Sequence, residues 1–324
     1  MIAVTGAAGF IGSVLVWRFN QLGERNIVCV DTRASAQDSA NLAPLTYREY
    51  IPHEAFLQRL TAGEWRGELQ CVFHLGACSS TTETDWDYLQ RNNIEYSQSL
   101  CEAALAAGAR FIHASSAATY GNGDHGYSDD HARLHELMAL NLYGRSKQLF
   151  DLWALDRGLL DRIVALKYFN VYGPNEWHKG SMRSMVCKGF EQIRDTGQVR
   201  LFKSDRAEYP DGGQKRDFIY VKDAVDMTLW FRDHPHANGV FNVGTGQAAD
   251  WNRLLTAVFT ALGREPRIEY IDMPAELIGS YQYFTQAEMT KLHAAGYRQP
   301  LTPLEDAVAD YVRQHLVNGR HLGA

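Results

Sequence analysis

The chain has 324 residues, of which 45% are hydrophobic and 22% are charged, and its formal net charge is -6. This composition is typical of a globular protein with a large core, and the length suits one large domain with a smaller one appended. The acidic balance excludes nucleic acid as the main partner, because a phosphate backbone demands a basic footprint. No apolar run reaches the roughly 18 residues of a membrane span. We expect a cytoplasmic protein, because the first residues form a strand with no basic leader before them.

The cysteines indicate no metal and no disulfide framework. Their number is odd, and no Cys-x-x-Cys pair occurs. A reducing compartment fits this pattern. The five are Cys29, Cys71, Cys78, Cys101 and Cys187.

The first half alternates short apolar runs with helical stretches. The predicted strands are residues 2–5, 27–31, 71–75, 111–115 and 163–169, and the clearest helices are residues 12–21 and 97–107. Strands alternating with helices form a parallel sheet that is covered on both faces. The pattern predicts an α/β protein with a doubly wound Rossmann sheet.

The pattern changes after Phe169. The sequence then predicts a helix at 181–194, a polar segment at 207–215, a strand at 217–221, a helix at 250–262 and a strand at 267–270. These pieces suggest a smaller, discontinuous α/β substrate domain. We assign residues 1–169 and 217–242 to a dinucleotide-binding domain, and residues 170–216 and 243–324 to the substrate domain.

A glycine-rich turn joins the first strand to the first helix. Gly6, Gly9 and Gly12 allow a tight turn and a close approach of the backbone to a pyrophosphate, which the helix N-terminus attracts. Asp31 closes the second strand, where its carboxylate would accept hydrogen bonds from a ribose. Asp31 and Asp38 would repel the 2'-phosphate of NADP, whereas Arg33 could pair with it, so NAD and NADP both stay open. A structural turn is the alternative for the glycines alone.

Three residues form a catalytic hypothesis. Ser116 follows the strand at 111–115, and Tyr143 and Lys147 are four residues apart, which places them on one helix face. A tyrosine hydroxyl titrates at about 10, and a nearby lysine cation should lower that pKa. Tyrosine can then take a proton from an alcohol while serine orients the substrate. By itself, such a Tyr-x-x-x-Lys pair occurs by chance on surface helices.

These motifs resemble those of the extended short-chain dehydrogenases/reductases. Longer strings are similar to those of the ADP-glycero-manno-heptose 6-epimerases within that family. They are GACSSTTE (76–83), ASSAATYG (114–121), YFNVYGP (168–174), HKGSM (178–182), KRDFIYV (215–221) and FTQ (284–286). The similarity runs from the first residue to about residue 297, and HKGSM and GACSSTTE are its most specific parts.

The resemblance implies a reaction and its cofactor. Tyr143, with NAD or NADP retained through the cycle, would oxidise the hydroxyl at heptose C6, and hydride would return to the other face of the ketone. Lys179 would be the second proton-transfer group and would also contact the cofactor. The resemblance places this step in the synthesis of lipopolysaccharide core precursors and implies a homo-oligomer.

The resemblance also assigns binding residues. Beyond the glycines, Asp31, Arg33 and the catalytic residues, the implied cofactor contacts are Phe10, Ile11, Thr32, Leu75, Gly76, Ala77, Cys78, Ser79, Asn92 and Val171. The implied substrate contacts are Asn170, Ser181, Lys188, Phe202, Lys203, Ser204, Asp205, Arg216 and Tyr281. Arg216 could hold a diphosphate by bidentate hydrogen bonds, or it could pair with Asp217 for structural reasons.

The chain departs from the family pattern at a few positions. Asp38 and His53 stand where lysines often occur, Lys188 replaces a histidine, and the segment 206–215 is longer than usual. A 4,6-dehydratase is disfavoured because Ala117 and Ala118 stand where its acid and base would be. The remaining alternatives are an epimerase of another nucleotide sugar, such as a UDP-hexose 4-epimerase, and a non-catalytic nicotinamide-sensing protein.

Overall fold

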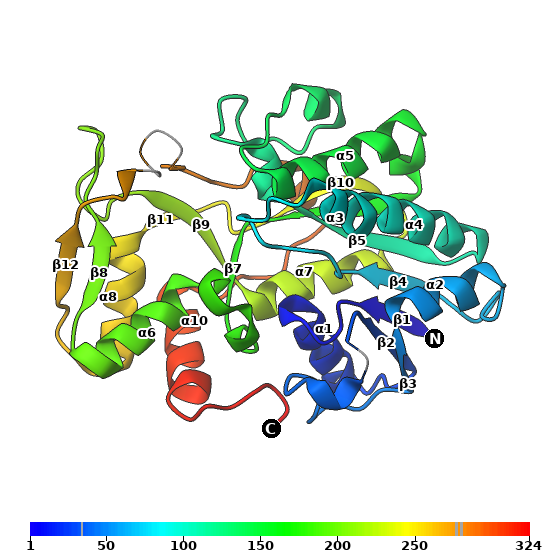
Figure 1. The fold of residues 1–324 in the computed structure, drawn as a ribbon, viewed down its shortest axis with the longest axis horizontal. Helices are drawn as coiled ribbons and strands as arrows, with labels where there is room; N and C mark the ends of the chain where they lie inside the picture. The colour runs from blue at the N-terminus through cyan, green and yellow to red at the C-terminus, as the bar shows by residue number, and fades with distance from the viewer. Residues whose placement is uncertain (34, 276–277, 279–280) are drawn as a thin grey trace.

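The structure, a computed structural model, describes residues 1–33, 35–275, 278 and 281–324. A seven-stranded sheet runs through its larger part in the order β10-β6-β5-β4-β1-β2-β3, with every neighbouring pair parallel (Figure 1). Its strands are β1 (Ile2–Thr5), β2 (Ile27–Asp31), β3 (Glu49–Pro52), β4 (Cys71–His74), β5 (Arg110–Ser116), β6 (Ile163–Tyr168) and β10 (Gly239–Val243). The predicted doubly wound α/β fold is confirmed.

Helices cover both faces of this sheet. In Figure 1, α1 and α7 lie on one side, and α3, α4 and α5 lie on the other. The helices of this larger part are α1 (Phe10–Gln21), α2 (His53–Thr61), α3 (Trp86–Leu89), α4 (Tyr96–Ala106), α5 (Leu142–Asp156) and α7 (Val221–Asp233). Strands β1, β4 and β6 are buried at every position, because both of their faces pack against helices.

Two smaller sheets lie beside the large one. In the first, β9 pairs in parallel with β7 and antiparallel with β11; in the second, β8 and β12 are parallel. Around them pack α6 and α8, with α10 close by (Figure 1). The remaining elements are β7 (Asn170–Tyr172), α6 (Met185–Thr196), β8 (Val199–Phe202), β9 (Lys215–Tyr220), β11 (Ala248–Asp250), α8 (Trp251–Ala261), β12 (Ile268–Ile271), α9 (Thr290–Ala294) and α10 (Leu304–Asp310).

The helix predicted at 181–194 begins later than expected. A 3-10 turn occupies Trp177–Met182, and α6 starts only at Met185. Ser184 is the reason, because its side chain caps the helix by accepting a hydrogen bond from the Cys187 amide. The amide and hydroxyl of Ser184 are in turn held by the buried Glu176 carboxylate.

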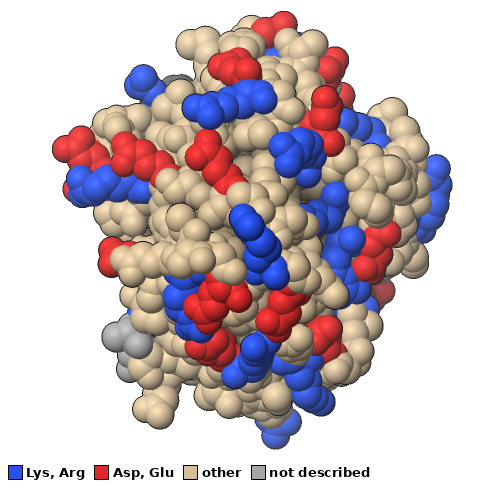
Figure 2. Space-filling view, turned by 90° about the vertical axis from the view of Figure 1, so that its right-hand side faces the viewer, with Lys and Arg blue, Asp and Glu red and all other residues tan. Residues whose placement is uncertain are grey.

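The surface carries both charges. On the face shown in Figure 2, lysine and arginine side chains are interspersed with aspartate and glutamate. In the described part of the chain, no helix is both long enough and apolar enough to cross a bilayer.

Two histidines lie side by side in the core of the large sheet. His74 on β4 and His113 on β5 are paired in register, with ring centroids 5.2 Å apart. Thr5 and Ser97 hydroxyls hold the two ring nitrogens of His74, whereas those of His113 have no hydrogen-bond partner among the described residues. Burial lowers the pKa of His74 to about 3 and lowers that of His113 well below its usual value, and the charge of Lys147 adds to both effects.

This pair should make folding sensitive to acid. Below pH about 6.5 the unfolded chain protonates these histidines while the folded chain does not, so stability is lost as pH falls from about 6.5 towards 3. His113→Leu should reduce the loss between pH 7.5 and 5.5 by about 1 kcal/mol, because one such site is removed. Urea unfolding at both pH values measures it. The exposed His125→Leu is the control, and an equal pH dependence in wild type and His113→Leu would contradict the prediction.

Candidate active site

A cavity of about 480 Å³ opens at the carboxyl ends of the central strands. The chain order of the strands reverses between β1 and β4, and ligands of doubly wound sheets bind at such a point. The segments that follow β1, β2, β4, β5 and β6 all contribute to its wall. Every predicted cofactor and catalytic residue lines this cavity.

The glycine turn brings backbone unusually close to backbone. Gly6 has φ +67°, and a Cβ there would lie 2.7 Å from the Cα of Gly76. A Cβ on Gly12 would lie 2.1 Å from the Gly6 carbonyl oxygen. Helix α1 starts behind Gly9 without a side-chain cap, so its first amides are left for a ligand. This cradle fits a dinucleotide pyrophosphate.

Asp31 stands at the end of β2 where an adenosine ribose is expected. Its Oδ2 accepts the Ala8 amide at 2.9 Å, and its Oδ1 accepts the Thr32 amide at 2.9 Å. Oδ1 also accepts the Thr32 hydroxyl at 3.4 Å, whereas Oδ2 keeps a further lone pair for a ribose hydroxyl. Arg33 lines the same part of the cavity. The side chain of Asp38 lies outside the described part of the structure.

The loop after β4 forms another part of the cavity wall and is held in place by hydrogen bonds to Asn93. Asn93 accepts the Cys78 amide and donates to the Cys78 carbonyl, both at 2.9 Å, and also donates to Ser146 on α5. The predicted residue Asn92 lines the cavity and donates to the Tyr88 carbonyl. The fully buried Asn93 was missed from the sequence, because an asparagine within a helical stretch gives no sign of whether its side chain points into the core.

Ser116, Tyr143 and Lys147 meet at the cavity as predicted. Ser116 ends β5, and its hydroxyl accepts the Ala118 amide at 3.1 Å and hydrogen-bonds with Tyr143. Asn141 caps α5 by accepting the Gly144 amide, so the helix starts just before Tyr143. Lys147 is one turn further along and only 2% exposed.

The predicted lowering of the Tyr143 pKa is wrong for the protein without its cofactor. Burial raises the pKa of the Tyr143 phenol, although its hydrogen bond with Ser116 opposes the shift. Burial also lowers the pKa of Lys147 to about 8. Desolvation disfavours both charged forms and outweighs the expected effect of the lysine on the phenol.

Lys179 reaches the same cavity from the 3-10 turn. Its Nζ lies 5.0 Å from the centre of the Phe10 ring at the start of α1. Burial lowers the pKa of Lys179, while the nearby Glu176 opposes and Lys188 adds to the shift. A lysine with a lowered pKa loses its proton more readily, which suits proton transfer.

A group of asparagines, also missed from the sequence, links this turn to the cofactor loop. The Asn41 amide donates to the carbonyls of Ala8 and Asn175, and its oxygen lies 2.7 Å from Nδ1 of His321. Asn175 has φ 75° and donates to Ser13 on α1 at 3.0 Å. Asparagine tolerates a left-handed backbone, and this was the one feature of the Tyr-Gly-Pro-Asn string that could have indicated a tight turn at Asn175.

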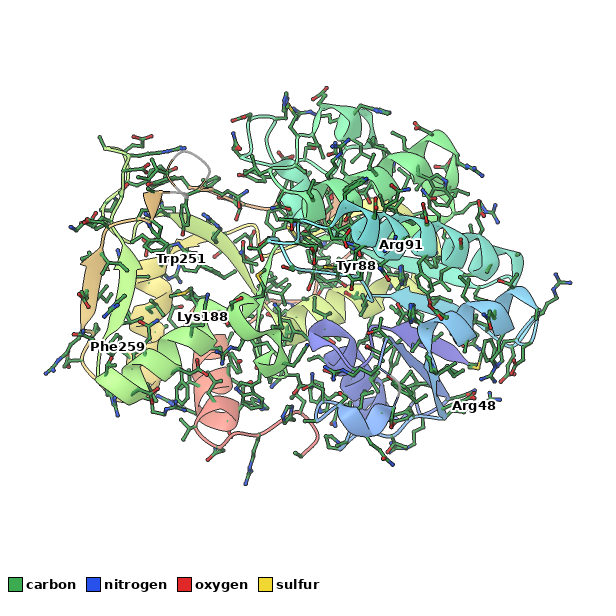
Figure 3. All side chains as sticks on the ribbon, viewed as in Figure 1. Arg48, Tyr88, Arg91, Lys188, Trp251 and Phe259 are labelled. Carbon is green, nitrogen blue, oxygen red and sulfur yellow. The ribbon has the colours of Figure 1, made fainter. Side chains whose placement is uncertain are left out.

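None of the nine predicted substrate residues lines the cavity in the described part of the chain. Two of the first three lie near Lys179: Ser181 is two residues further along the chain, and the charge of Lys188 acts on Lys179. Asn170 begins β7 between the cavity residues Phe169 and Val171, and the Ser181 carbonyl accepts the Lys188 amine at 3.4 Å. Figure 3 shows Lys188 on α6 and Trp251 at the start of α8, on the side of the smaller sheets.

The other six surround an aromatic cluster on the smaller sheets. The Arg216 guanidinium lies 5.3 Å from the Tyr281 ring and 5.8 Å from the Trp251 ring, and it donates to the Gln282 carbonyl. Phe202 packs edge-on against Tyr281. The remaining contacts are an ion pair of Lys203 with Asp272, a bond from the Ser204 amide to Asp211 and a bond between Asp205 and the Tyr283 hydroxyl.

Asp217 is engaged elsewhere. Its carboxylate accepts the amides of Thr245, Gly246 and Ala287 at 2.7 to 2.9 Å. The structural alternative for Arg216, an ion pair with Asp217, is therefore not the contact that these residues make. Trp251 was missed from the sequence, because an aromatic residue at a helix start is more often part of the core.

Comparison with known proteins gives consistent matches. A family model described as the NAD dependent epimerase/dehydratase family matches residues 2–244. An ADP-L-glycero-D-manno-heptose-6-epimerase from Nitratidesulfovibrio vulgaris (strain DP4) is 54% identical over 316 residues, which cover 98% of each chain.

Two solved structures show how widely the fold is shared. The ADP-L-glycero-D-manno-heptose-6-epimerase of Helicobacter pylori superposes with a TM-score of 0.81 at 29% identity, over 97% of this chain and 95% of that one. The UDP-glucose 4-epimerase of Thermotoga maritima, solved with UDP-glucose, has a TM-score of 0.77 at 24% identity, over 97% and 98% of the two chains. The second likeness shows the fold alone.

Proposed function

Since the chain belongs to the NAD dependent epimerase/dehydratase family, we propose that it interconverts ADP-D-glycero-D-manno-heptose and ADP-L-glycero-D-manno-heptose by inverting C6. One observation carries the proposal: Ser116, Tyr143 and Lys147 face the same cavity as Lys179, beside a cradle for a dinucleotide. The names of the relatives support heptose as the sugar, and the product would serve lipopolysaccharide core synthesis.

The roles of the residues follow from their chemistry. Ser116 holds the C6 hydroxyl, and Tyr143 takes its proton as C6 becomes a ketone. Lys147 stabilises the phenolate by its charge. The glycine turn and Asp31 would hold the nicotinamide cofactor, which would supply the hydride chemistry: removal of hydride from C6 and its return to the opposite face of the ketone. The ammonium of Lys179 then donates a proton to the alkoxide that hydride return forms, and the neutral amine regains a proton from water.

The proposal predicts conversion without added cofactor, because the hydride is borrowed and returned. NMR of C6 after mixing purified protein with ADP-D-glycero-manno-heptose tests this. A mixture of both C6 epimers is the expected result, with one NAD or NADP released per chain on denaturation. No conversion even with added NAD and NADP would contradict heptose as the substrate, and UDP-hexoses would be tried next. Turnover that consumes cofactor stoichiometrically would instead indicate a dehydrogenase or reductase.

The choice between NAD and NADP should depend on Asp31. Its carboxylate faces the ribose position, and a 2'-phosphate there would meet like charge. Asp31→Ala should therefore raise the ratio of NADP to NAD affinity about tenfold, or about 1.4 kcal/mol. Fluorescence titration of the apoprotein with both cofactors measures the ratio. An unchanged ratio would show that Asp31 does not read the 2'-position.

Three further expectations accompany the function. Residues 1–169 and 217–242 would bind the cofactor, and residues 170–216 and 243–324 the sugar nucleotide; six of the seven strands of the large sheet lie before residue 170. The five free cysteines favour the cytoplasm. We expect a homo-oligomer, which light scattering would detect.

A further inference from the structure

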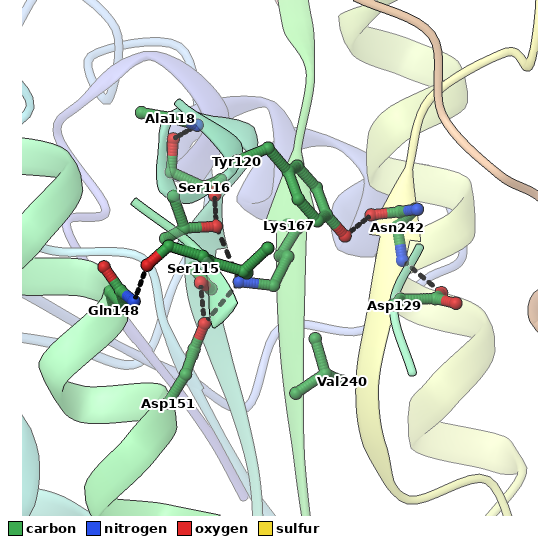
Figure 4. A network of polar contacts seen from close by, with 12 residues as sticks. Ser115, Ser116, Ala118, Tyr120, Asp129, Gln148, Asp151, Lys167, Val240 and Asn242 are labelled. Atoms are coloured by element: carbon green, nitrogen blue, oxygen red, sulfur yellow. Dashed lines mark hydrogen bonds and ion pairs between the residues drawn. The ribbon is translucent and has the colours of Figure 1, made fainter. Parts of the chain in front are cut away.

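A buried ion pair stands behind the catalytic groups. Lys167 on β6 and Asp151 on α5 have side chains 0% and 1% exposed, and their Nζ and Oδ2 atoms are 2.7 Å apart (Figure 4). Placing two charges so deep costs desolvation, and an apolar pair of similar volume is often as stable. Stability alone is therefore a weak account of this pair.

Each partner contacts a segment that carries Ser116. The second bond to Asp151 Oδ2 comes from the Ser115 hydroxyl, at 2.7 Å, on the residue before Ser116. Lys167 donates to the Thr119 hydroxyl at 2.7 Å, and that hydroxyl donates to the Ser116 carbonyl at 2.9 Å. Figure 4 shows these contacts around the end of β5. Ser116 is thus held through both of its neighbouring segments.

The same carboxylate acts on Lys147. Asp151 is four residues after Lys147 on α5, and residues at that spacing share a helix face. The buried Oδ1 of Asp151 has no hydrogen-bond donor among the described residues. An unpaired buried oxygen costs free energy, but its charge is little screened and stabilises a neighbouring ammonium.

We propose that Asp151 and Lys167 are positioning residues of this active site, which fix Ser116 from behind and keep Lys147 protonated. The inference rests on the proposed function, because it takes Ser116 and Lys147 as catalytic groups.

The groups around Lys147 determine the direction of the effect. Burial lowers the pKa of Lys147 to about 8, while the charge of Asp151 opposes the shift most and that of Cys78, on the loop after β4, opposes it less. Tyr143 faces Lys147 from the same helix, and its pKa is raised by burial. Asp151 is thus the main group that keeps the Lys147 pKa from falling further.

The two histidines of the sheet beneath do not offset the loss of the Asp151 charge. His74 and His113 are buried and neutral, because burial and the charge of Lys147 lower the pKa of both. Replacing Asp151 with asparagine would also leave Lys167 without its ionic partner. We expect the loss of the Asp151 charge and the unpaired charge of Lys167 to lower the pKa of Lys147 together.

The decisive experiment is the pH profile of kcat for wild type and Asp151→Asn, measured by NMR on the holoenzyme. We expect kcat at pH 7.5 to fall about tenfold and the alkaline limb to move down by about one pH unit, with bound nicotinamide unchanged. Asp151→Glu should restore the limb. Asp129→Asn is the matched control, because it removes the buried carboxylate that accepts the Asn242 amide at the far end of the network.

The control separates positioning from stability. Asp129→Asn should lower Tm and leave the alkaline limb in place, whereas Asp151→Asn should move both. An Asp151→Asn enzyme with a lower Tm and an unmoved limb would overturn the proposal. If wild type acts on another sugar nucleotide, the proposed function fails, and the same comparison is made with that substrate.

A second variant covers the case in which Asp151→Asn does not fold. Thr119→Val removes one hydroxyl and breaks the link from Lys167 to the Ser116 carbonyl. It should lower kcat about fivefold or more while KM changes less than about twofold, because the variant shifts the reacting hydroxyl held by Ser116 but leaves the groups that bind the rest of the substrate in place. Unchanged kcat in Thr119→Val would overturn the proposal.

Discussion

Replacing Tyr143 with phenylalanine should reduce epimerisation about 10³-fold, because the substrate alcohol loses the group that takes its proton. The ring would still fill its place at the start of α5, and only the hydroxyl that hydrogen-bonds with Ser116 would be lost. NMR of C6 measures the rate, and denaturation followed by chromatography measures the bound nicotinamide. The nucleotide content and Tm should stay close to those of wild type.

Tyr270→Phe is the matched control. Tyr270 lies on β12 of a smaller sheet, and its hydroxyl donates to Asn252 on α8, away from the cavity. This variant should epimerise at the wild-type rate. If Tyr143→Phe also kept full activity, the mechanism would be wrong, and another group in the cavity would have to take the proton.

The strands that the sequence predicted share one property: each contains a run of buried apolar residues. β1, β2, β4, β5 and β6 are covered by helices on both faces, so continuous apolar runs identify them. The edge strand β3 reads Glu-Tyr-Ile-Pro, which is too short and too polar for such a signal. The predicted strand at 217–221 exists as β9, but its pairing with β7 and β11 depends on contacts that no local pattern encodes.

The meeting of Ser116, Tyr143 and Lys147 at one cavity was predictable, because they are close in sequence or lie at a strand end. Tyr143 and Lys147 are one helical turn apart, and Ser116 ends β5. The motif strings also predicted the family, which the comparisons confirm.

The pairing of Asp151 with Lys167 was not predictable in this way. In the sequence alone, Asp151 is a polar residue of a helix and Lys167 a single charge within an apolar strand. They form a pair only because α5 and β6 bring their side chains together. The prediction of the Tyr143 pKa was wrong for a related reason, because desolvation depends on the whole surrounding structure.

Replacing Lys179 with methionine should reduce epimerisation by about 10²- to 10³-fold, because the inverted alcohol loses its proton-transfer group. The apolar stem can still pack near the Phe10 ring, so nicotinamide should stay bound. Oxidation of the epimer that faces Tyr143 should survive, and a single turnover would show it as the near-ultraviolet absorbance of reduced cofactor.

Two further variants decide what Lys179 contributes. Lys179→Arg keeps the positive charge, but a guanidinium does not give up its proton, so this variant should be as inactive as Lys179→Met if proton transfer is the role. Lys215→Met removes an exposed lysine of β9 and should leave the rate unchanged. Activity restored by arginine would instead assign Lys179 to electrostatic binding of the substrate. The second proton would then have to come from water or from Tyr143.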